Sequence, residues 1–140
     1  GGDRIAHVLV DDFVERFRRF WNDPHPANLG SLLTDDVRLV QPLSPPTQGL
    51  AAAQASFRRL FAQFPDLRGS VDRWCGDDHS VFIEFRLHGT LGRRPLEWPA
   101  VDRFTLVGDK ASERVSYFDG VPLVVALLRH PLQAWRLATR

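Results

Sequence analysis

Asp102 is the acidic residue of this sequence whose surroundings most suggest chemistry. It shares strand parity with five apolar residues, so this face of a strand should point inward. The five are Leu96, Trp98, Ala100, Phe104 and Leu106. A carboxyl among apolar side chains is costly to ionise, so its pKa should rise and it could act as an acid or base, or donate a hydrogen bond to a developing enolate. The alternative is a structural role, in which Asp102 pairs with a nearby arginine or with Tyr117.

Aromatic side chains at helical or strand spacing could line a pocket for a flat or polycyclic ligand. The expected lining residues are Phe17, Trp21, Phe57, Phe61, Trp74, Phe85 and Trp98. Gln41, after the first strand, and Tyr117, near the end of the last, are the expected polar contacts to the ligand. Aromatic residues with this spacing are also typical of an ordinary core, so both interpretations remain open.

Other kinds of site find less support in the sequence. His88 falls on a mixed strand face, which suits a surface or interface better than catalysis, and Asp119 is placed to cap a helix. No His, Asp or Glu grouping has the spacing of a metal site. There is no glycine-rich phosphate loop and no recognisable Ser-His-Asp set. We therefore expect neither a metal nor a cofactor.

The composition narrows the possible partners. The 140 residues carry a formal net charge of +1, with 44% hydrophobic and 25% charged residues, so nothing in the overall charge favours nucleic acid or an anionic membrane. No apolar run approaches the length of a membrane span. The single cysteine, Cys75, and the lack of a signal-peptide pattern favour a cytoplasmic protein. Gly1 and Gly2 are interpreted as a remnant of an expression tag.

Helices are predicted in the first half of the chain and again near its C-terminal end. Apolar residues spaced by three or four predict a helix over 4–21, and Pro24 ends it. A short helix is expected over 26–33, and a second long helix runs from Gly49 to about 64. A last, strongly apolar helix over 121–129 should cover either the mouth of a pocket or a partner.

The remaining segments alternate as strands do. A brief strand is predicted over 37–40, followed by a stiff loop over 42–46 that contains three prolines. Further strands are expected over 67–75, 80–91, 96–107 and 111–118, with turns between them. Positions 81, 83, 85 and 87 form an apolar face and positions 82, 84, 86 and 88 a mixed one, which could be solvated or form a dimer contact.

These elements predict an α+β domain. A cone-shaped, curved and largely antiparallel sheet of about five strands would wrap around the N-terminal helices, with a short helix near the C-terminus. The single domain should span 3–130, and 131–140 should form a tail. A bent sheet with helices across its open side leaves a cavity between the layers. We expect this cavity between the first helix, the 50–64 helix and the concave side of the sheet.

The order of elements resembles the nuclear transport factor 2-like superfamily, and in particular its SnoaL-like branch of polyketide cyclases, relatives of ketosteroid isomerase and limonene epoxide hydrolase. The resemblance covers about residues 5–128. Six fragments carry it: Leu33-Thr34-Asp35-Asp36-Val37, Gly49, Phe64-Pro65-Asp66-Leu67, His88-Gly89-Thr90, Asp102-Arg103-Phe104 and Tyr117-Phe118-Asp119. Together they are specific for the fold but not for a reaction.

The resemblance also implies which catalytic sets are incomplete. Alignment with ketosteroid isomerase places Phe17 at its tyrosine, Gln41 at its base and Asp102 at its aspartate donor, so only the donor is kept. Alignment with limonene epoxide hydrolase places Ser116 at a catalytic aspartate, so that set is also broken. The polyketide cyclases rely mainly on one aspartate acting as acid or base in an apolar cavity, and Asp102 matches that requirement.

Two functions therefore remain open. The first is an enzyme of cyclase, isomerase or hydro-lyase type, using Asp102 on a polyketide- or steroid-like substrate. The second is a non-catalytic module that binds an apolar small molecule or a partner protein. The resemblance implies a homodimer in either case.

Overall fold

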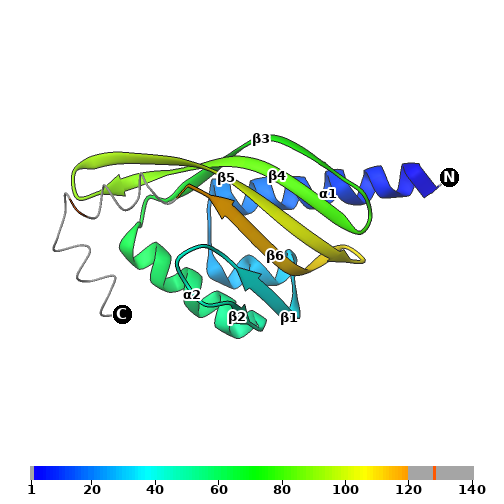
Figure 1. Ribbon diagram of the computed structural model, residues 1–140, viewed down its shortest axis with the longest axis horizontal. Helices are drawn as coiled ribbons and strands as arrows, with labels where there is room; N and C mark the ends of the chain where they lie inside the picture. The colour runs from blue at the N-terminus through cyan, green and yellow to red at the C-terminus, as the bar shows by residue number, and fades with distance from the viewer. Residues whose placement is uncertain (1, 120–127, 129–140) are drawn as a thin grey trace.

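The computed structural model describes residues 2–119 and 128. Its helical elements are α1 (Gly2–Asn22), the 3-10 helix η1 (Pro26–Ser31) and α2 (Leu50–Gln63). Its strands are β1 (Leu33–Val40), β2 (Thr47–Gln48), β3 (Arg68–Gly76), β4 (Ser80–Leu91), β5 (Arg94–Val107) and β6 (Lys110–Phe118). Figure 1 shows a curved, open sheet with the helices on one side, which confirms the predicted α+β class. The helix predicted over 121–129 lies outside the described residues, apart from residue 128.

The sheet has the strand order β2-β1-β6-β5-β4-β3. Neighbouring strands are antiparallel except β1 and β6, which are parallel. The prediction of about five strands missed β2, which is too short to show any periodicity, and it started β1 four residues late. Asp35 and Asp36 are poor strand formers, but pairing with β6 extends β1 back to Leu33, which lies opposite Ala111. Tertiary pairing thus overrides local propensity at this edge.

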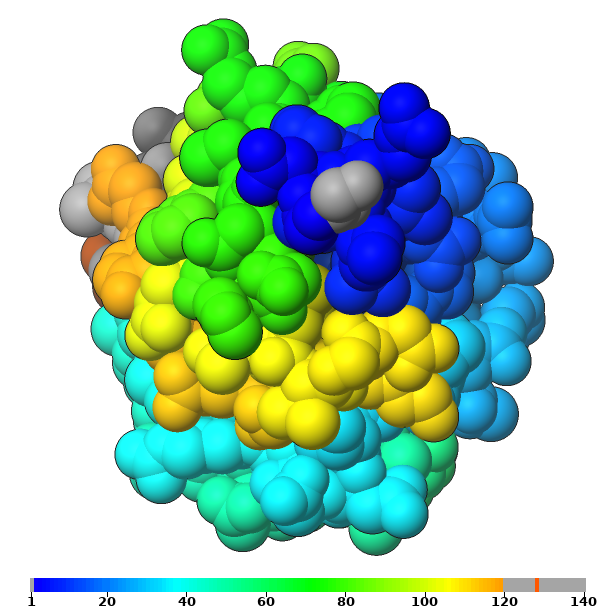
Figure 2. Space-filling model, turned by 90° about the vertical axis from the view of Figure 1, so that its right-hand side faces the viewer, coloured from blue at the N-terminus to red at the C-terminus, as the bar shows by residue number. Residues whose placement is uncertain are grey.

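Helix α1 packs its apolar face against the sheet. The helix has six buried residues: Val10, Phe13, Val14, Phe17, Phe20 and Trp21. The ring of Phe13 contacts that of Phe104 at a centroid distance of 4.8 Å, and the ring of Phe17 contacts that of Phe85 at 5.0 Å, both edge to face. Each buried aromatic side chain of this size contributes about 1.5–3 kcal/mol. In Figure 2 the exposed start of α1 faces the viewer, beside the green residues of β3.

Helix α2 begins at a glycine with a backbone that other residues rarely adopt. Gly49 has φ 92° and ψ 152°, its N–H donates to the carbonyl of Val37, and its own carbonyl accepts from Ala53. These bonds direct the chain from β2 into a helix that packs on η1 and β1. Ala53 and Phe57 are the buried residues of α2. The helix therefore closes the side of the molecule that α1 leaves open.

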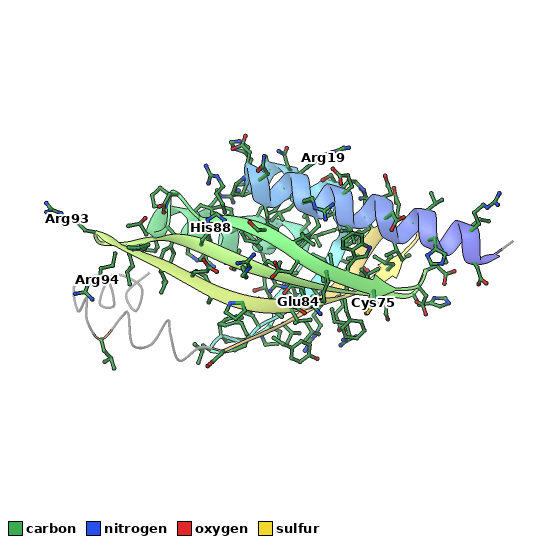
Figure 3. The ribbon with its side chains drawn as sticks, turned by 90° about the horizontal axis from the view of Figure 1, so that it is seen from above. Arg19, Cys75, Glu84, His88, Arg93 and Arg94 are labelled. Carbon is green, nitrogen blue, oxygen red and sulfur yellow. The ribbon has the colours of Figure 1, made fainter. Side chains whose placement is uncertain are left out.

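The β4–β5 hairpin is the longest part of the sheet, and its tip is polar. Arg93 and Arg94 lie at that tip, far from Cys75 near the end of β3 (Figure 3). A carboxylate holds the hairpin to the loop after α2, since Asp66 accepts from the hydroxyl of Thr90 at 2.6 Å and from its N–H at 3.0 Å. Within the described part of the chain, no helix combines the length and apolarity that a membrane crossing requires.

Candidate functional site

A cavity of about 230 Å³ lies between α1, α2 and the concave side of the sheet. Most of its wall is apolar or aromatic. The apolar lining residues are Trp21, Leu39, Phe57, Leu60, Phe64, Phe85, Leu87, Trp98, Ala100 and Phe118. The polar lining residues are Gln41, Ser44, Ser56, Asp102, Arg114 and Ser116. A largely apolar cavity with a few convergent polar groups is typical of a small-molecule site.

Asp102 is the acidic residue of this cavity. Only 2% of its surface is exposed, which confirms the inward orientation that strand parity predicted. It lies opposite Ser116 on β6, and the Ser116 hydroxyl donates a hydrogen bond to its Oδ1 atom. No hydrogen bond from a described residue to its Oδ2 atom is found. Burial raises the pKa of Asp102, although the charge of Arg114 and the hydrogen bond from Ser116 oppose the rise.

Arg114 is the cationic residue among the described residues that line the cavity. Its Nη2 atom donates to Oε1 of Gln41 at 2.7 Å. Burial lowers the pKa of Arg114, and the charge of Asp102 opposes that effect. The two charges act through space, because none of the ion pairs among the described residues joins Asp102 to Arg114. Four polar residues thus lie together on an otherwise apolar wall. We call this group the polar row: Gln41, Arg114, Asp102 and Ser116.

The loop after β1 orients the first member of the polar row. The Nε2 atom of Gln41 donates to the Ser44 hydroxyl at 2.8 Å and to the carbonyl of Pro45 at 3.0 Å. These two bonds use the amide donors of Gln41, which leaves its oxygen for the guanidinium of Arg114. The proline-rich loop therefore orients the Gln41 side chain so that its amide oxygen accepts from Arg114.

A second, much smaller cavity lies behind the polar row. Its volume is about 20 Å³, enough for roughly one water molecule. Asp102 and Arg114 line both cavities. The other residues around the smaller cavity are apolar: Phe17, Phe20, Trp21, Leu29, Leu32, Leu33, Leu39, Phe57 and Phe104. Asp102 and Arg114 therefore lie between two cavities: the smaller one is otherwise lined by apolar residues, and the larger one is the candidate ligand site.

Most of the predicted site residues lie around these cavities. Gln41, Phe85 and Trp98 line the larger cavity, Phe17 lines the smaller one, and Trp21 and Phe57 line both. Phe61 lines neither cavity. Its ring instead contacts the rings of Phe20, Trp21 and Phe57 at centroid distances of 5.8–6.5 Å, within the aromatic cluster that supports the wall.

Two predicted ligand contacts lie away from the cavity. Tyr117 is 53% exposed and lies opposite Val101, one position out of step with Ser116 and therefore on the other face of the sheet. Trp74 is on the same face as Ile83, its partner on β4, but it is 39% exposed at the edge strand β3. The guanidinium of Arg18 covers its ring at 5.2 Å. The structure does not bring either residue to Asp102.

Sequence reasoning did not single out Arg114, and it noted Ser116 only as the residue that replaces a catalytic aspartate of limonene epoxide hydrolase. Both alternate with Phe118 along β6, and this parity was available in the sequence. The apolar alternation of Val115 and Tyr117 made the opposite face look like the buried one. Cross-strand register shows the correct face, because Phe104 lies opposite Arg114 and Asp102 lies opposite Ser116.

The arrangement suits proton transfer on a bound organic molecule. One carboxyl with a raised pKa lines an apolar cavity, which favours acid or base catalysis. Among the described residues, no group of three or more His, Cys, Asp or Glu side chains is placed to hold a metal ion.

A model of the SnoaL-like domain family matches residues 14–114. Solved structures with the same fold include a protein assigned as a SnoaL-like polyketide cyclase from Jannaschia sp. CCS1, at 20% identity and a TM-score of 0.72 over 84% of this chain and 92% of that one. An epoxide hydrolase of limonene epoxide hydrolase type from M. tuberculosis has 17% identity and a TM-score of 0.72, over 89% and 92%. TerC, co-crystallised with polyporic acid, has 16% identity and a TM-score of 0.73, over 83% and 98%. No curated protein sequence matches the chain.

Proposed function

Because the chain belongs to the SnoaL-like domain family, we propose that it is a cofactor-independent enzyme that uses Asp102 as an acid or base on an apolar small molecule. The reaction would be of cyclase, isomerase or hydro-lyase type, on a polyketide- or steroid-like substrate. The observation that carries the proposal is that Asp102, buried and with a raised pKa, is the single acidic residue lining the larger cavity, counted over residues 2–119 and 128.

In the proposed reaction, a carbonyl-bearing ligand lies against the aromatic wall with its reacting carbon near Oδ2 of Asp102. The carboxylate takes a proton from the carbon next to the carbonyl, which leaves an enolate and a neutral carboxyl. That carboxyl then returns the proton to a second atom of the ligand. A raised pKa helps both steps, because it makes the carboxylate a stronger base and makes the neutral acid easier to form.

Two further observations support this use of the cavity. Ser116 fixes the orientation of Asp102 through Oδ1, as a base must be held to work at one position of a ligand. The structure of TerC with polyporic acid supports a small organic molecule as the ligand class for this fold.

Proton exchange tests the proposal before the natural substrate is identified. The probe is 2-tetralone, a bicyclic ketone with acidic C–H groups, and NMR measures exchange of these protons in D2O. We expect the wild-type protein to accelerate exchange and Asp102→Asn to lose about 100-fold or more of that acceleration. Thermal unfolding of the two proteins should be similar at low pH, since asparagine still accepts from Ser116. Equal acceleration by the variant would contradict a role of Asp102 in proton transfer.

A non-catalytic binding module is the second candidate function. It is favoured by the outer face of the sheet, where Phe82 and Tyr117 remain 41% and 53% exposed, a surface that a second copy of the chain could cover. This module would be a dimer that binds an apolar molecule or a partner protein. It predicts saturable binding of 2-tetralone without accelerated exchange, and a dimer in light scattering. A monomer that catalyses exchange would exclude it.

A further inference from the structure

We infer that the ligand of the larger cavity carries an anionic oxygen, such as a carboxylate or phenolate, that binds Arg114. The inference rests on the proposed function in using the same cavity, and it adds the chemical class of the ligand. It depends on no step of the reaction, because it concerns which molecule the protein holds.

The first argument is the hydrogen bonding of Arg114. A guanidinium has five N–H donors in a fixed planar fork. One of them, on Nη2, binds Gln41, and this is the one hydrogen bond that joins Arg114 to a described residue, so further Nη hydrogens remain for an acceptor in the larger cavity that Arg114 lines. The Nε–H also lacks a partner, but it is shielded from accessible space and is not counted as a contact to the ligand.

The second argument is charge. The amide oxygen of Gln41 satisfies a donor but carries no net charge, and Asp102 forms no direct ion pair with Arg114. One water in the 20 Å³ cavity could accept from an N–H but would not balance the charge. A partly buried cation of this kind is stabilised by an anion that reaches it from the larger cavity.

The third argument is the shape of the site. Arg114 lies at a wall whose other residues are mostly aromatic or aliphatic, and the 230 Å³ cavity exceeds the roughly 150 Å³ that is known to hold a benzene molecule in a protein. The cavity thus suits a bicyclic apolar body with one anionic group at its edge. Among residues 2–119, no other arginine lines this cavity, and Arg103 on β5 is paired with Glu113 at 3.4 Å.

Binding of matched acid and amide probes tests the inference. The probes are 2-naphthoate and 2-naphthamide, with benzoate and benzamide as a smaller pair, and calorimetry at pH 7 measures the affinities. We expect the wild-type protein to bind 2-naphthoate at least 10-fold more tightly than 2-naphthamide. Arg114→Gln should lose this preference, and Arg114→Lys should keep part of it, because lysine keeps the charge but not the planar fork. The control, Arg103→Gln, should keep the full preference.

The inference is overturned if the wild-type protein binds acid and amide equally, if Arg114→Gln keeps the preference, or if neither acid binds up to its solubility. The comparison of probes on the wild-type protein decides the matter even if Arg114→Gln fails to fold. The result is independent of the exchange assay. A protein that prefers 2-naphthoate but does not exchange 2-tetralone would retain this inference and lose the proposed enzyme.

Discussion

At the scale of single residues, the site depends on a carboxyl and a guanidinium that share an enclosure without touching. Burial raises the pKa of Asp102 and lowers that of Arg114, so each group is shifted towards its neutral form while the charge of the other resists the shift. Ser116 adds a hydrogen bond that favours the carboxylate. The pKa of Asp102 is therefore set by burial, which raises it and is the largest effect, against the charge of Arg114 and the hydrogen bond from Ser116, which lower it.

The pH dependence of stability should report this balance. Because the pKa of Asp102 is higher in the folded state than in the unfolded chain, its contribution to stability is complete below the unfolded pKa of about 3.9 and is lost as pH rises through the folded value. Asp102→Asn lacks this titration. We expect the free energy of unfolding of wild type, relative to the variant, to fall as pH rises from 3 to 8. Urea titrations across this range measure the difference, and a constant or rising difference would be inconsistent with a raised pKa.

Ser116→Ala should raise the pKa of Asp102 further. The variant removes the hydroxyl that donates to Oδ1, and this bond favours the ionised carboxyl. NMR titration of the Asp102 carboxyl carbon gives the shift directly. Ser112→Ala is the control, since Ser112 is on the same strand and its hydroxyl contacts the carbonyl of Thr105 instead. A lower pKa in Ser116→Ala, or no change, would show that the hydroxyl does not stabilise the charged form.

At the scale of elements, α2 and the loops around it decide where the cavity wall lies. The chain enters α2 through Gly49, whose φ of 92° lies in a region that is nearly restricted to glycine. Asp66 then binds Thr90 just after α2, and so joins the loop after the helix to the end of β4. These contacts fix both ends of the helix that carries Phe57 and Leu60 into the cavity wall.

Gly49→Ala should destabilise the fold. We expect a loss of about 1–3 kcal/mol, because alanine is strained at this backbone conformation even though its Cβ would meet the Asp35 carbonyl oxygen at an ordinary 3.8 Å. Gly30→Ala is the matched control: its Cβ would also find ordinary space, 3.6 Å from Leu50, without a positive φ, and the expected change is within about 0.5 kcal/mol. Equal losses from the two variants in denaturant unfolding would argue against backbone strain as the cause.

The sequence predicted the elements better than their pairing. Periodicity located both long helices and strands β4 and β5, because each has a continuous apolar face, and turn residues marked the bounds of β3 and β6. It missed β2 and the start of β1, where hydrogen bonds to neighbouring strands rather than side-chain pattern define the strand. In the site, parity on β5 identified Asp102, whose neighbours are apolar. Parity failed on β6, where the inward face carries Arg114 and Ser116, and only the register with β5 shows which face is buried.

At the scale of the whole molecule, the cavity is the part of the core between two helices and a curved sheet that side chains leave unfilled. Ala100 shows how this happens: it is 4% exposed, lies between Phe85 and Phe118 on neighbouring strands, and is the smallest side chain of the wall. A larger residue there would extend into the cavity.

Ala100→Leu should therefore close the cavity to ligands while keeping the fold. The added methyl groups enter free space rather than a packed core, so we expect stability to change by less than the 1–3 kcal/mol typical of overpacking. Binding of 2-tetralone, followed through tryptophan fluorescence, should weaken at least 10-fold. Ala51→Leu, on the exposed side of α2, should leave binding unchanged. Unimpaired binding in Ala100→Leu would place the ligand elsewhere.

The most direct test of the account is the pKa of Asp102 itself. Protein labelled with 13C at the aspartate carboxyl carbons can be titrated by NMR, with the Asp102 signal assigned by its loss in Asp102→Asn. We predict that this carboxyl titrates above the ordinary value of 3.8, because burial in the cavity outweighs the attraction of Arg114 and the hydrogen bond from Ser116. A titration midpoint at or below 3.8 would show that Asp102 is a stabilised anion, and it would contradict the role of an acid or base poised for proton transfer.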